Sequence, residues 1–365
     1  SFEVVAQDGD ARAGVLHTPH GDLFTPLFAP VGTQATVKAL TPAQLEELGV
    51  SLVLANTYHL FLRPGTALIA EAGGIHRFMG WPRPMLTDSG GYQIFSLAKI
   101  RRVDEDGVTF RSHIDGSYQR LTPELAMSAQ EDIGADIIMS FDECAPPYDR
   151  AYNEAALRRT HAWARRCLEA KHRPDQALFG IVQGGVFDDL REQSAAFISA
   201  LPFDGVAIGG LSVGESKTDT YRVLDLMKNL LPIDRPRYLM GVGAPADMIN
   251  AVRRGVDIFD CVQPTRLARH GAALSRVGRL SLRKAEFQHD ERPIESDCTC
   301  YTCTHFTRSY LRHLLISKEM LFATLVSMHN IHFLVRLMDR MRESILAGRF
   351  SEFAAESILE GITNE

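Results

Sequence analysis

The sequence has no long apolar run and no secretory signal pattern. Its first residues, SFEVVAQDGDARAG, are polar and acidic, unlike the charged and then apolar start of a signal peptide. No apolar stretch approaches the roughly 20 residues that a membrane-spanning helix needs. We therefore expect a cytoplasmic protein that does not use a membrane.

Cysteine is scarce, with six residues in a chain of 365. Three of the six lie between positions 298 and 303, in the stretch DCTCYTCTHF. Thiols stay reduced in the cytosol, so clustered cysteines there hold metal more often than they form disulfides. Three thiols also leave one unpaired in any disulfide scheme.

The sequence also lacks an overall excess of positive charge, since its formal net charge is -6. That balance argues against a polyanionic partner, but the charge is unevenly spread. Residues 263–350 hold 14 Lys or Arg against 8 Asp or Glu, which leaves -12 for the remainder. The asymmetry favours an anionic ligand for the last quarter of the chain, although a solvated surface explains the charge alone equally well.

Short apolar and β-branched runs recur along the chain. They are residues 23–30, 51–58, 84–88, 135–142, 177–185, 205–210, 237–243 and 256–262. Segments with helical spacing, such as TPAQLEELG and NEAALRRTHAWARRCLEA, separate most of them. Eight buried strands that alternate with helices predict an α/β protein with a (β/α)8 TIM barrel; a doubly wound sheet is the alternative.

We expect three parts in this fold. Residues 1–262 form most of the barrel, and residues 263–345 form an inserted or appended subdomain that carries the cysteine cluster and most of the excess positive charge. Residues 346–365 form a helical segment that packs on the barrel.

Three aspartates follow predicted strands: Asp88, Asp142 and Asp260. Barrel enzymes carry their reactive groups at the C-terminal ends of the strands, where glycine pairs such as Gly184-Gly185 and Gly209-Gly210 also collect. Two carboxylates that face one sugar can cleave a glycosidic bond, and a third can accept hydrogen bonds from a guanine-like edge. Each aspartate could instead be a helix cap or an ion-pair partner.

The cysteine cluster reads Cys298-x-Cys300-x-x-Cys303 and precedes a helical region with several histidines. Three thiolates and one imidazole complete a closed, structural zinc site. His329 is the preferred fourth ligand, with His305 and His313 as alternatives.

These motifs resemble the tRNA-guanine transglycosylases, also called queuine tRNA-ribosyltransferases, along nearly the whole chain. The similar stretches are PVGTQATVK (30–38), TDSGGYQIFSL (87–97), FDEC (141–144), VQGG (182–185), GGLSVGE (209–215), MGVG (240–243), FDCVQPTRLARHG (259–271) and the cysteine cluster. The resemblance implies a barrel enzyme that exchanges guanine at the wobble position of a tRNA anticodon for a 7-deazaguanine base.

The resemblance also implies roles for individual residues. Asp260 would attack the ribose to form a covalent ribosyl-enzyme, while Asp88 would act as general acid and then base. The residues around the base would be Tyr92, Asp142, Cys144, Gln183, Gly210, Leu211, Val213 and Met240. The resemblance also implies contacts with tRNA from Arg266 and Arg269. Further candidates from the residues themselves are Lys284, Arg308 and Arg312, because the two arginines, four positions apart, share a helix face that could meet phosphates. Cys298, Cys300, Cys303 and His329 would bind one structural Zn²⁺ per chain.

The bacterial branch of this family is the most similar, because Val213 stands where eukaryotic catalytic subunits have glycine, and Cys144 also fits that branch. We therefore expect 7-aminomethyl-7-deazaguanine as the incoming base. The RNA partners would be the tRNAs with a GUN anticodon, for Asp, Asn, His and Tyr, and we expect a homodimer. A non-catalytic tRNA-binding partner subunit and a barrel glycosidase with a structural zinc are the alternative functions.

Overall fold

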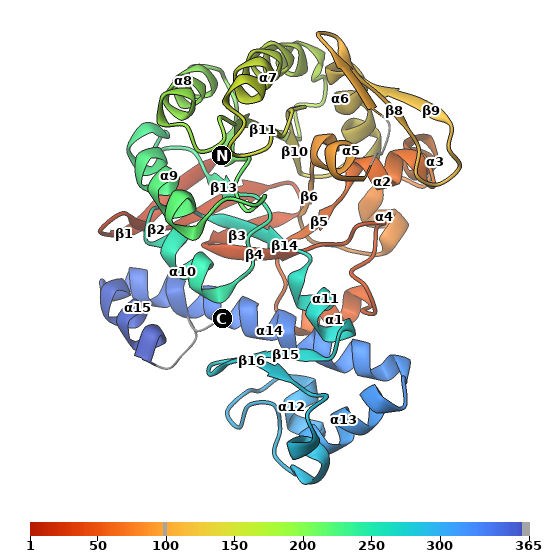
Figure 1. The fold of residues 1–365 in the computed structure, drawn as a ribbon, viewed down its shortest axis with the longest axis vertical. Coiled ribbons are helices and arrows are strands. Elements are labelled where there is room, and N and C mark those ends of the chain that lie inside the picture. The colour runs from red at the N-terminus through yellow and green to blue at the C-terminus, as the bar shows by residue number, and fades with distance from the viewer. Residues whose placement is uncertain (98–100, 360–365) are drawn as a thin grey trace.

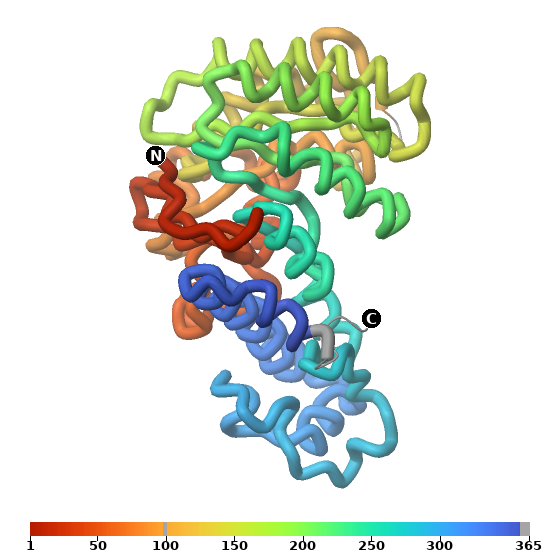
Figure 2. The backbone as a smooth tube through the Cα atoms, turned by 90° about the vertical axis from the view of Figure 1, so that its left-hand side faces the viewer, coloured from red at the N-terminus to blue at the C-terminus, as the bar shows by residue number. Residues whose placement is uncertain are grey.

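The fold is seen in a computed structural model that describes residues 1–97 and 101–359, with the last two of these described by their backbone alone. Figures 1 and 2 show an elongated molecule with a barrel at one end of its long axis and a smaller subdomain at the other. Residues 360–365 of the predicted C-terminal helical segment lie outside the described residues.

An eight-stranded parallel sheet forms the barrel, with the strand order β4-β14-β13-β12-β11-β10-β6-β5. Its strands are β4 (Leu27–Pro30), β5 (Val53–Ala55), β6 (Met85–Thr87), β10 (Ile137–Met139), β11 (Ala177–Val182), β12 (Gly205–Ile208), β13 (Arg237–Leu239) and β14 (Ile258–Cys261). A parallel bridge between Val31 and Leu54 joins the first and last strands of that order. Each strand lies in one of the eight predicted apolar runs, so the predicted (β/α)8 barrel is confirmed.

Helices connect the strands and cover the outside of the barrel (Figure 1). They are α1 (Pro42–Glu47), α2 (Thr57–Leu62), α3 (Thr66–Glu71), α4 (Ile75–Met79), α5 (Gly91–Leu97), α6 (Pro123–Ile133), α7 (Arg150–Ala170), α8 (Asp188–Ser199), α9 (Lys217–Leu230), α10 (Pro245–Val252) and α11 (Gln263–Arg269). Local sequence fixes several of their starts. In α1, for example, the Thr41 hydroxyl and the Gln44 side chain form a reciprocal capping box, and proline occupies the first turn.

Apolar side chains fill the interior of the barrel. The members of this inner cluster on the strands include Leu27, Ala29, Leu54, Leu86, Ile137, Met139, Phe179, Ile181, Ala207, Tyr238 and Ile258. Leu16 and Leu23 join them from an antiparallel sheet of β1 (Phe2–Asp8), β2 (Ala11–Thr18) and β3 (Gly21–Thr25), which precedes the barrel. Because the interior is packed, ligand chemistry is confined to the C-terminal ends of the strands and the loops that follow them.

Two further pieces extend the barrel. The antiparallel strands β7 (Arg101–Asp104), β8 (Gly107–Arg111) and β9 (Tyr118–Leu121) lie between α5 and α6. After α11 the chain forms the hairpin β15 (Ala272–Ser275) and β16 (Gly278–Ser281), the 3-10 helix η1 (Ala285–His289), α12 (Tyr301–His305) and α13 (Arg308–Ile316). This second piece has its own buried cluster, which includes Leu282, Phe287, Ile294, Cys300, Cys303 and Leu311.

Helix α14 (Met320–Leu346) ties this subdomain to the barrel. Phe322 and Leu325 near its start belong to the subdomain cluster, whereas Leu334 and Met341 near its end belong to the main cluster around the barrel. The final helix, α15 (Phe350–Leu359), also contributes to the main cluster. The domain limits near 263 and 345 stay a prediction, since one continuous helix serves both cores.

Helix α14 is long and apolar enough to cross a membrane by length and composition, with a mean hydropathy of 1.3 over its best window. From the sequence we expect no apolar stretch to approach the length of a membrane-spanning helix, and this finding corrects that expectation. However, 67% of the window is buried inside the protein, as in the core helix of a soluble protein, so the finding is weak support for a membrane span.

Candidate active site

A cavity of about 360 Å³ lies at the C-terminal ends of the barrel strands. All ten residues predicted to act on the sugar or to bind the base line it. They are Asp88, Tyr92, Asp142, Cys144, Gln183, Gly210, Leu211, Val213, Met240 and Asp260. The structure therefore brings together residues that are up to 172 positions apart in the sequence.

Asp88 follows β6 and is 7% exposed. The backbone N–H of Thr57 donates to its Oδ1 at 2.8 Å, while the Asn56 and Gln93 amides donate to its Oδ2 at 2.6 and 2.7 Å. Burial raises the pKa of Asp88 to about 6 although these donors lower it, and the charge of Asp260 raises it further. Asp88 is thus suited to exchange a proton near neutral pH.

Asp260 lies in β14 and is 9% exposed. The Tyr238 hydroxyl and the Gly241 backbone N–H both donate to its Oδ1, at 2.5 and 2.9 Å. Its Oδ2 accepts no hydrogen bond from residues 1–97 or 101–359. Burial raises the pKa of Asp260, and the two donors oppose that rise. One carboxylate oxygen is therefore held in place while the other is left for a ligand.

Asp142 lies beyond β10 and shares the cavity wall with Gln183. The Ser89 hydroxyl donates to Asp142 Oδ1 at 2.8 Å, and the Gln183 amide donates to Oδ2 at 2.7 Å. Burial raises the pKa of this carboxyl group as well. A buried carboxylate beside an amide can accept and donate hydrogen bonds along one edge of a purine.

The rest of the wall is backbone and half-buried side chains. Gly210 has φ of +67°, and a Cβ there would lie 2.4 Å from Gln183 Oε1, so a side chain at this position would be strained and would displace Gln183. Tyr92 is 50% exposed, which leaves its ring available for stacking. Burial raises the pKa of Cys144 to about 12, so its thiol stays protonated and is a poor nucleophile. The Val213 N–H donates to the Glu215 carboxylate at 3.0 Å.

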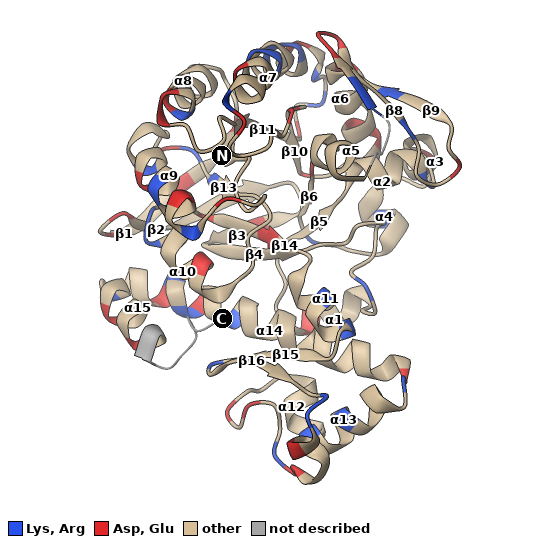
Figure 3. Cartoon of the chain, viewed as in Figure 1, with Lys and Arg blue, Asp and Glu red and all other residues tan. Residues whose placement is uncertain are grey.

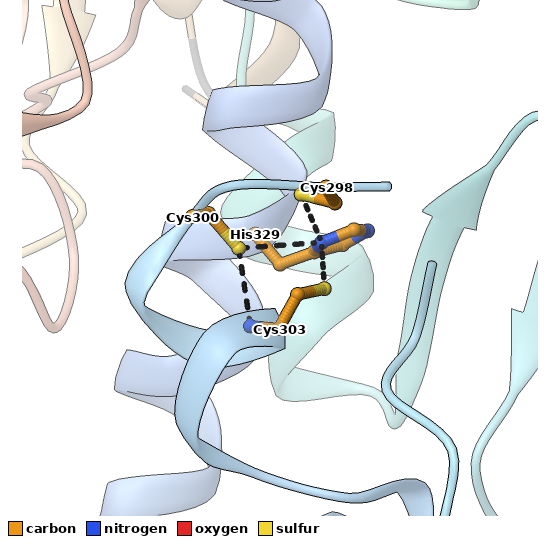
Figure 4. A group of neighbouring side chains, drawn as sticks. All are labelled: Cys298, Cys300, Cys303 and His329. Carbon is orange, nitrogen blue, oxygen red and sulfur yellow. Dashed lines mark hydrogen bonds between the residues drawn. The ribbon is translucent and has the colours of Figure 1, made fainter. Parts of the chain in front are cut away.

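The predicted zinc ligands converge in the subdomain, as Figure 4 shows. The three sulfur atoms of Cys298, Cys300 and Cys303 lie 3.7, 3.6 and 3.3 Å from His329 Nδ1. Tetrahedral zinc with usual Zn–S and Zn–N bond lengths separates sulfur and nitrogen ligands by about 3.5 Å. The four side chains therefore fit one Zn²⁺, and the alternatives His305 and His313 are not part of this cluster.

The second ring nitrogen of His329 supports that fit. His329 Nε2 lies 2.7 Å from the carbonyl oxygen of Leu274 in β15, to which it donates when Nδ1 binds metal. A histidine that ligates a metal commonly donates its other N–H to a carbonyl in this way, which fixes the ring. The ligands come from the loop before α12, from α12 and from α14, so a bound ion joins three segments.

His20, His76 and Asp136 form another cluster, close enough to be considered for metal. The two imidazole rings stack at 3.6 Å between centroids with 12° between their planes, and each ring bonds to the Asp136 carboxylate. Nearly parallel rings at this separation cannot both hold one ion in their planes. We therefore interpret this cluster as a hydrogen-bonded histidine pair on a buried carboxylate.

Comparison with known proteins identifies the family. The family model described as queuine tRNA-ribosyltransferase matches residues 7–360. The chain belongs to the queuine tRNA-ribosyltransferase family. Proteins named queuine tRNA-ribosyltransferase from Herpetosiphon aurantiacus and Pelotomaculum thermopropionicum are 56% and 55% identical to it over 354 and 356 residues. These alignments cover 97% of this chain, and 90% and 96% of the two relatives. The resemblance found in the sequence is confirmed.

In this member of the family, two of the predicted tRNA contacts lie next to the cavity. Arg266 and Arg269 are exposed on α11, which begins two residues after β14. Neither forms an ion pair with a residue in the described ranges. Figure 3 shows basic residues, coloured blue, on α11 and in the subdomain around α13.

The other three residues predicted to contact tRNA interact with neighbouring residues of the subdomain. Arg308 forms an ion pair with Asp290 at 3.2 Å and donates to the Ile294 carbonyl at 2.7 Å. Arg312 donates to the carbonyl of Lys284 at 3.0 Å, while the Lys284 side chain is exposed. Arg308 and Arg312 thus each have a partner within the subdomain, and the tRNA contacts of all three residues stay predictions.

Several residues around the site escaped the sequence analysis. Asn56 follows β5 and is recognisable by the same strand-end rule that found Asp88. Tyr238 is an inward-facing position of β13, for which alternation along the strand is a signal. Arg191, behind the glycine loops, has no local sequence signal at all.

Proposed function

We propose that this chain is a pentosyltransferase that exchanges guanine at the wobble position of tRNA for 7-aminomethyl-7-deazaguanine. Its family membership supports a reaction on tRNA. The observation that carries the chemistry is the pairing of Asp260, with one unbonded carboxylate oxygen, and Asp88 in one cavity. That pairing suits a double displacement at a sugar carbon.

In the first step, Asp260 Oδ2 attacks C1' of the ribose, and the bond from C1' to the purine nitrogen breaks. The Tyr238 and Gly241 donors hold Oδ1, which fixes the orientation of the carboxylate during the attack. In the second step, the nitrogen of the incoming base attacks C1' and releases Asp260. Two inversions leave the sugar with its original configuration.

Asp88 transfers the proton in both steps. It donates a proton to the departing guanine and then takes one from the incoming base. A pKa of about 6 keeps a fraction of Asp88 protonated near neutral pH without making it a weak base. A positioned acid or base of this kind contributes about 10² to 10⁴ in rate.

The base lies against the Asp142 and Gln183 side chains and the backbone at Gly210 and Leu211. Tyr92 and Met240 stack on its faces from the rim of the cavity. Val213 narrows the cavity near the 7-substituent, which favours the small aminomethyl group over the cyclopentenediol of queuine. Cys144 contributes as a protonated, uncharged wall residue.

The tRNA partners in this proposal are those with a GUN anticodon. Anticodon loops suit the reaction because their bases can be splayed out into a pocket. Arg266 and Arg269 meet the neighbouring phosphates, and the excess positive charge of residues 263–350 extends that surface. Zinc fits the Cys3His cluster and supports the subdomain without entering the reaction.

We further propose a cytoplasmic homodimer. Tyr301 and Tyr310 of the subdomain are 42% and 39% exposed, and the Tyr310 ring stacks on Phe306 at 5.4 Å. An exposed aromatic group of this kind suits a protein contact. Analytical ultracentrifugation with and without tRNA tests the dimer, and a monomer at micromolar concentration in both samples contradicts it.

Incorporation of labelled guanine into unmodified tRNA tests the function. The purified chain is expected to label tRNAs with a GUN anticodon and to leave other tRNAs unlabelled. Loss of the label on addition of 7-aminomethyl-7-deazaguanine is expected as well. A protein that binds tRNA without any labelling is instead a non-catalytic partner subunit, and one that hydrolyses simple glycosides is a barrel glycosidase.

A further inference from the structure

Arg191 is a buried cation directly behind the glycine loops of the cavity. It lies in the first turns of α8, and its exposed fraction is 0%. Its guanidinium donates to the carbonyl oxygens of Gly185 at 2.7 Å, Gly209 at 2.8 Å, Val182 at 3.2 Å and Gly210 at 3.3 Å. One side chain therefore joins the loop after β11 to the loop after β12.

The bonds to Gly209 and Gly210 fix the direction of two amide groups. In a trans peptide the N–H points away from the C=O of the same unit. Because the Gly209 and Gly210 carbonyls point at Arg191, the N–H groups of Gly210 and Leu211 point away from it. Gly209, Gly210 and Leu211 line the cavity, whereas Arg191 does not. Neither N–H has a hydrogen-bond partner within residues 1–97 and 101–359.

The placement of Arg191 has a cost that packing alone does not explain. No carboxylate within the described residues lies at ion-pair distance from its guanidinium. Burial lowers the pKa of Arg191 to about 10, so the group still carries its charge at neutral pH. A cation near the start of a helix also opposes the helix dipole. Burying a charge is costly unless it is hydrogen-bonded, and the four carbonyl oxygens supply those bonds to Arg191.

We propose that Arg191 is a positioning residue that aims the Gly210 and Leu211 amide N–H groups at the base in the cavity. It acts through the backbone and does not touch the substrate. This inference rests on the proposed function, because the ligand of the two amides is the carbonyl edge of a purine. Preorganised amides of this type stabilise negative charge that develops on the leaving base.

The test compares Arg191→Lys and Arg191→Met with a matched control, Arg237→Lys. Arg237 is also buried, at 7% exposed, and donates to the Leu231 and Pro232 carbonyls. It lies at the start of β13, at the opposite end of the barrel. Guanine exchange gives kcat and KM, calorimetry gives the affinity for free guanine, and filter binding gives the affinity for tRNA.

Arg191→Met is expected to lower kcat/KM for guanine about 100-fold, the scale of losing one aimed amide donor. Arg191→Lys keeps the charge but loses the planar set of guanidinium donors, so its kcat/KM is expected to lie between those of Arg191→Met and the wild type. The tRNA affinity is expected to stay within about two-fold, since phosphate contacts carry most of it. Arg237→Lys is expected to lower Tm without changing kcat/KM.

The proposal is overturned if Arg191→Lys and Arg191→Met keep the kcat/KM of the wild type. It is also overturned if Arg237→Lys loses as much kcat/KM as the Arg191 variants do. If Arg191→Met does not fold, Arg191→Lys alone decides by the same criterion. If the wild type exchanges no guanine, the proposed function fails, and unchanged guanine affinity in Arg191→Lys then overturns this inference separately. A wild-type chain that neither exchanges nor binds guanine overturns both.

Discussion

The Tyr238 hydroxyl donates a hydrogen bond of 2.5 Å to Oδ1 of Asp260, in the floor of the cavity. This bond stabilises the charged form of a buried carboxylate that burial alone would keep protonated. Together with the Gly241 N–H, it keeps one oxygen occupied and orients the other. Removing the Tyr238 hydroxyl therefore tests the role of Asp260 as the nucleophile.

Tyr238→Phe is expected to raise the pKa of Asp260, because it removes a donor that lowers it. Asp260 must be ionised to attack, so the acid limb of the profile of kcat/KM against pH should move to higher pH. A hydrogen bond to a charged group is worth about 1.5 to 3 kcal/mol, which is about one to two pH units. Tyr58→Phe is the control, because Tyr58 is also buried but bonds to His113. An acid limb that stays in place in Tyr238→Phe contradicts this role.

Asp88→Asn is expected to abolish exchange and to stabilise the fold at alkaline pH. The folded pKa of about 6 lies above the ordinary value of 3.8, so the folded state binds the proton more tightly. Stability is therefore lost as pH rises from about 4 to 6, by up to about 3 kcal/mol. Gln93 Oε1 is buried without a partner, and rotation of that amide lets it accept from the new side chain.

Thermal unfolding at pH 4.5 and pH 8 measures this effect. The gain in Tm of Asp88→Asn over the wild type should be larger at pH 8. Asp175→Asn is the control and should show nearly the same difference from the wild type at both pH values, because Arg173 holds the pKa of Asp175 below its ordinary value of 3.8 and both pH values lie above it. If Asp88→Asn differs from the wild type by the same Tm at both pH values, the raised pKa of Asp88 is contradicted.

Loss of a zinc ligand is expected to unfold the subdomain. Cys303 and Cys300 belong to its small buried cluster, and helix α14 extends the effect to the barrel. Cys303→Ser and His329→Ala should each contain less than one zinc per chain by mass spectrometry and should unfold at a lower temperature. His305→Ala and His313→Ala serve as controls that keep full zinc. Full zinc and unchanged Tm in His329→Ala contradict the assigned ligand set.

Val213→Gly is expected to admit queuine. The wild type should prefer 7-aminomethyl-7-deazaguanine and guanine, because the Val213 side chain occupies space in the wall of the cavity proposed to hold the base. Each methylene-sized contact that is gained or lost in an apolar pocket changes the ratio of the kcat/KM values for two substrates by about 10 to 200-fold. Competition between the three bases for one tRNA measures the ratio, with Val262→Gly, elsewhere on the cavity wall, as the control. Preference of the wild type for queuine contradicts the role of Val213.

Much of this site was predictable because of how a barrel is built. Parallel strands end at one rim, so the residues after each apolar run, such as Asp88, Asp142 and Asp260, were expected to meet. The cysteine spacing similarly predicted a cluster, and His329 was selected correctly from three histidines. In both cases the prediction depended on local patterns with a fixed spatial consequence.

Other features depend on contacts between distant segments. Arg191 acts through four carbonyls on two loops, and nothing in the sequence of α8 marks it. The ion pair of Arg308 with Asp290, 18 residues earlier, likewise has no signal in the local sequence. Helical spacing predicts which side chains share a face, but it does not predict which partner that face meets.

The covalent intermediate tests the central claim most directly. The wild-type enzyme is incubated with unmodified tRNA and no incoming base, then denatured, and the products are analysed on a gel and by mass spectrometry. A tRNA adduct on the peptide that contains Asp260 is predicted, which guanine should reverse and which Asp260→Asn should lack. An adduct that persists in Asp260→Asn, or one that maps to Asp88, contradicts Asp260 as the nucleophile.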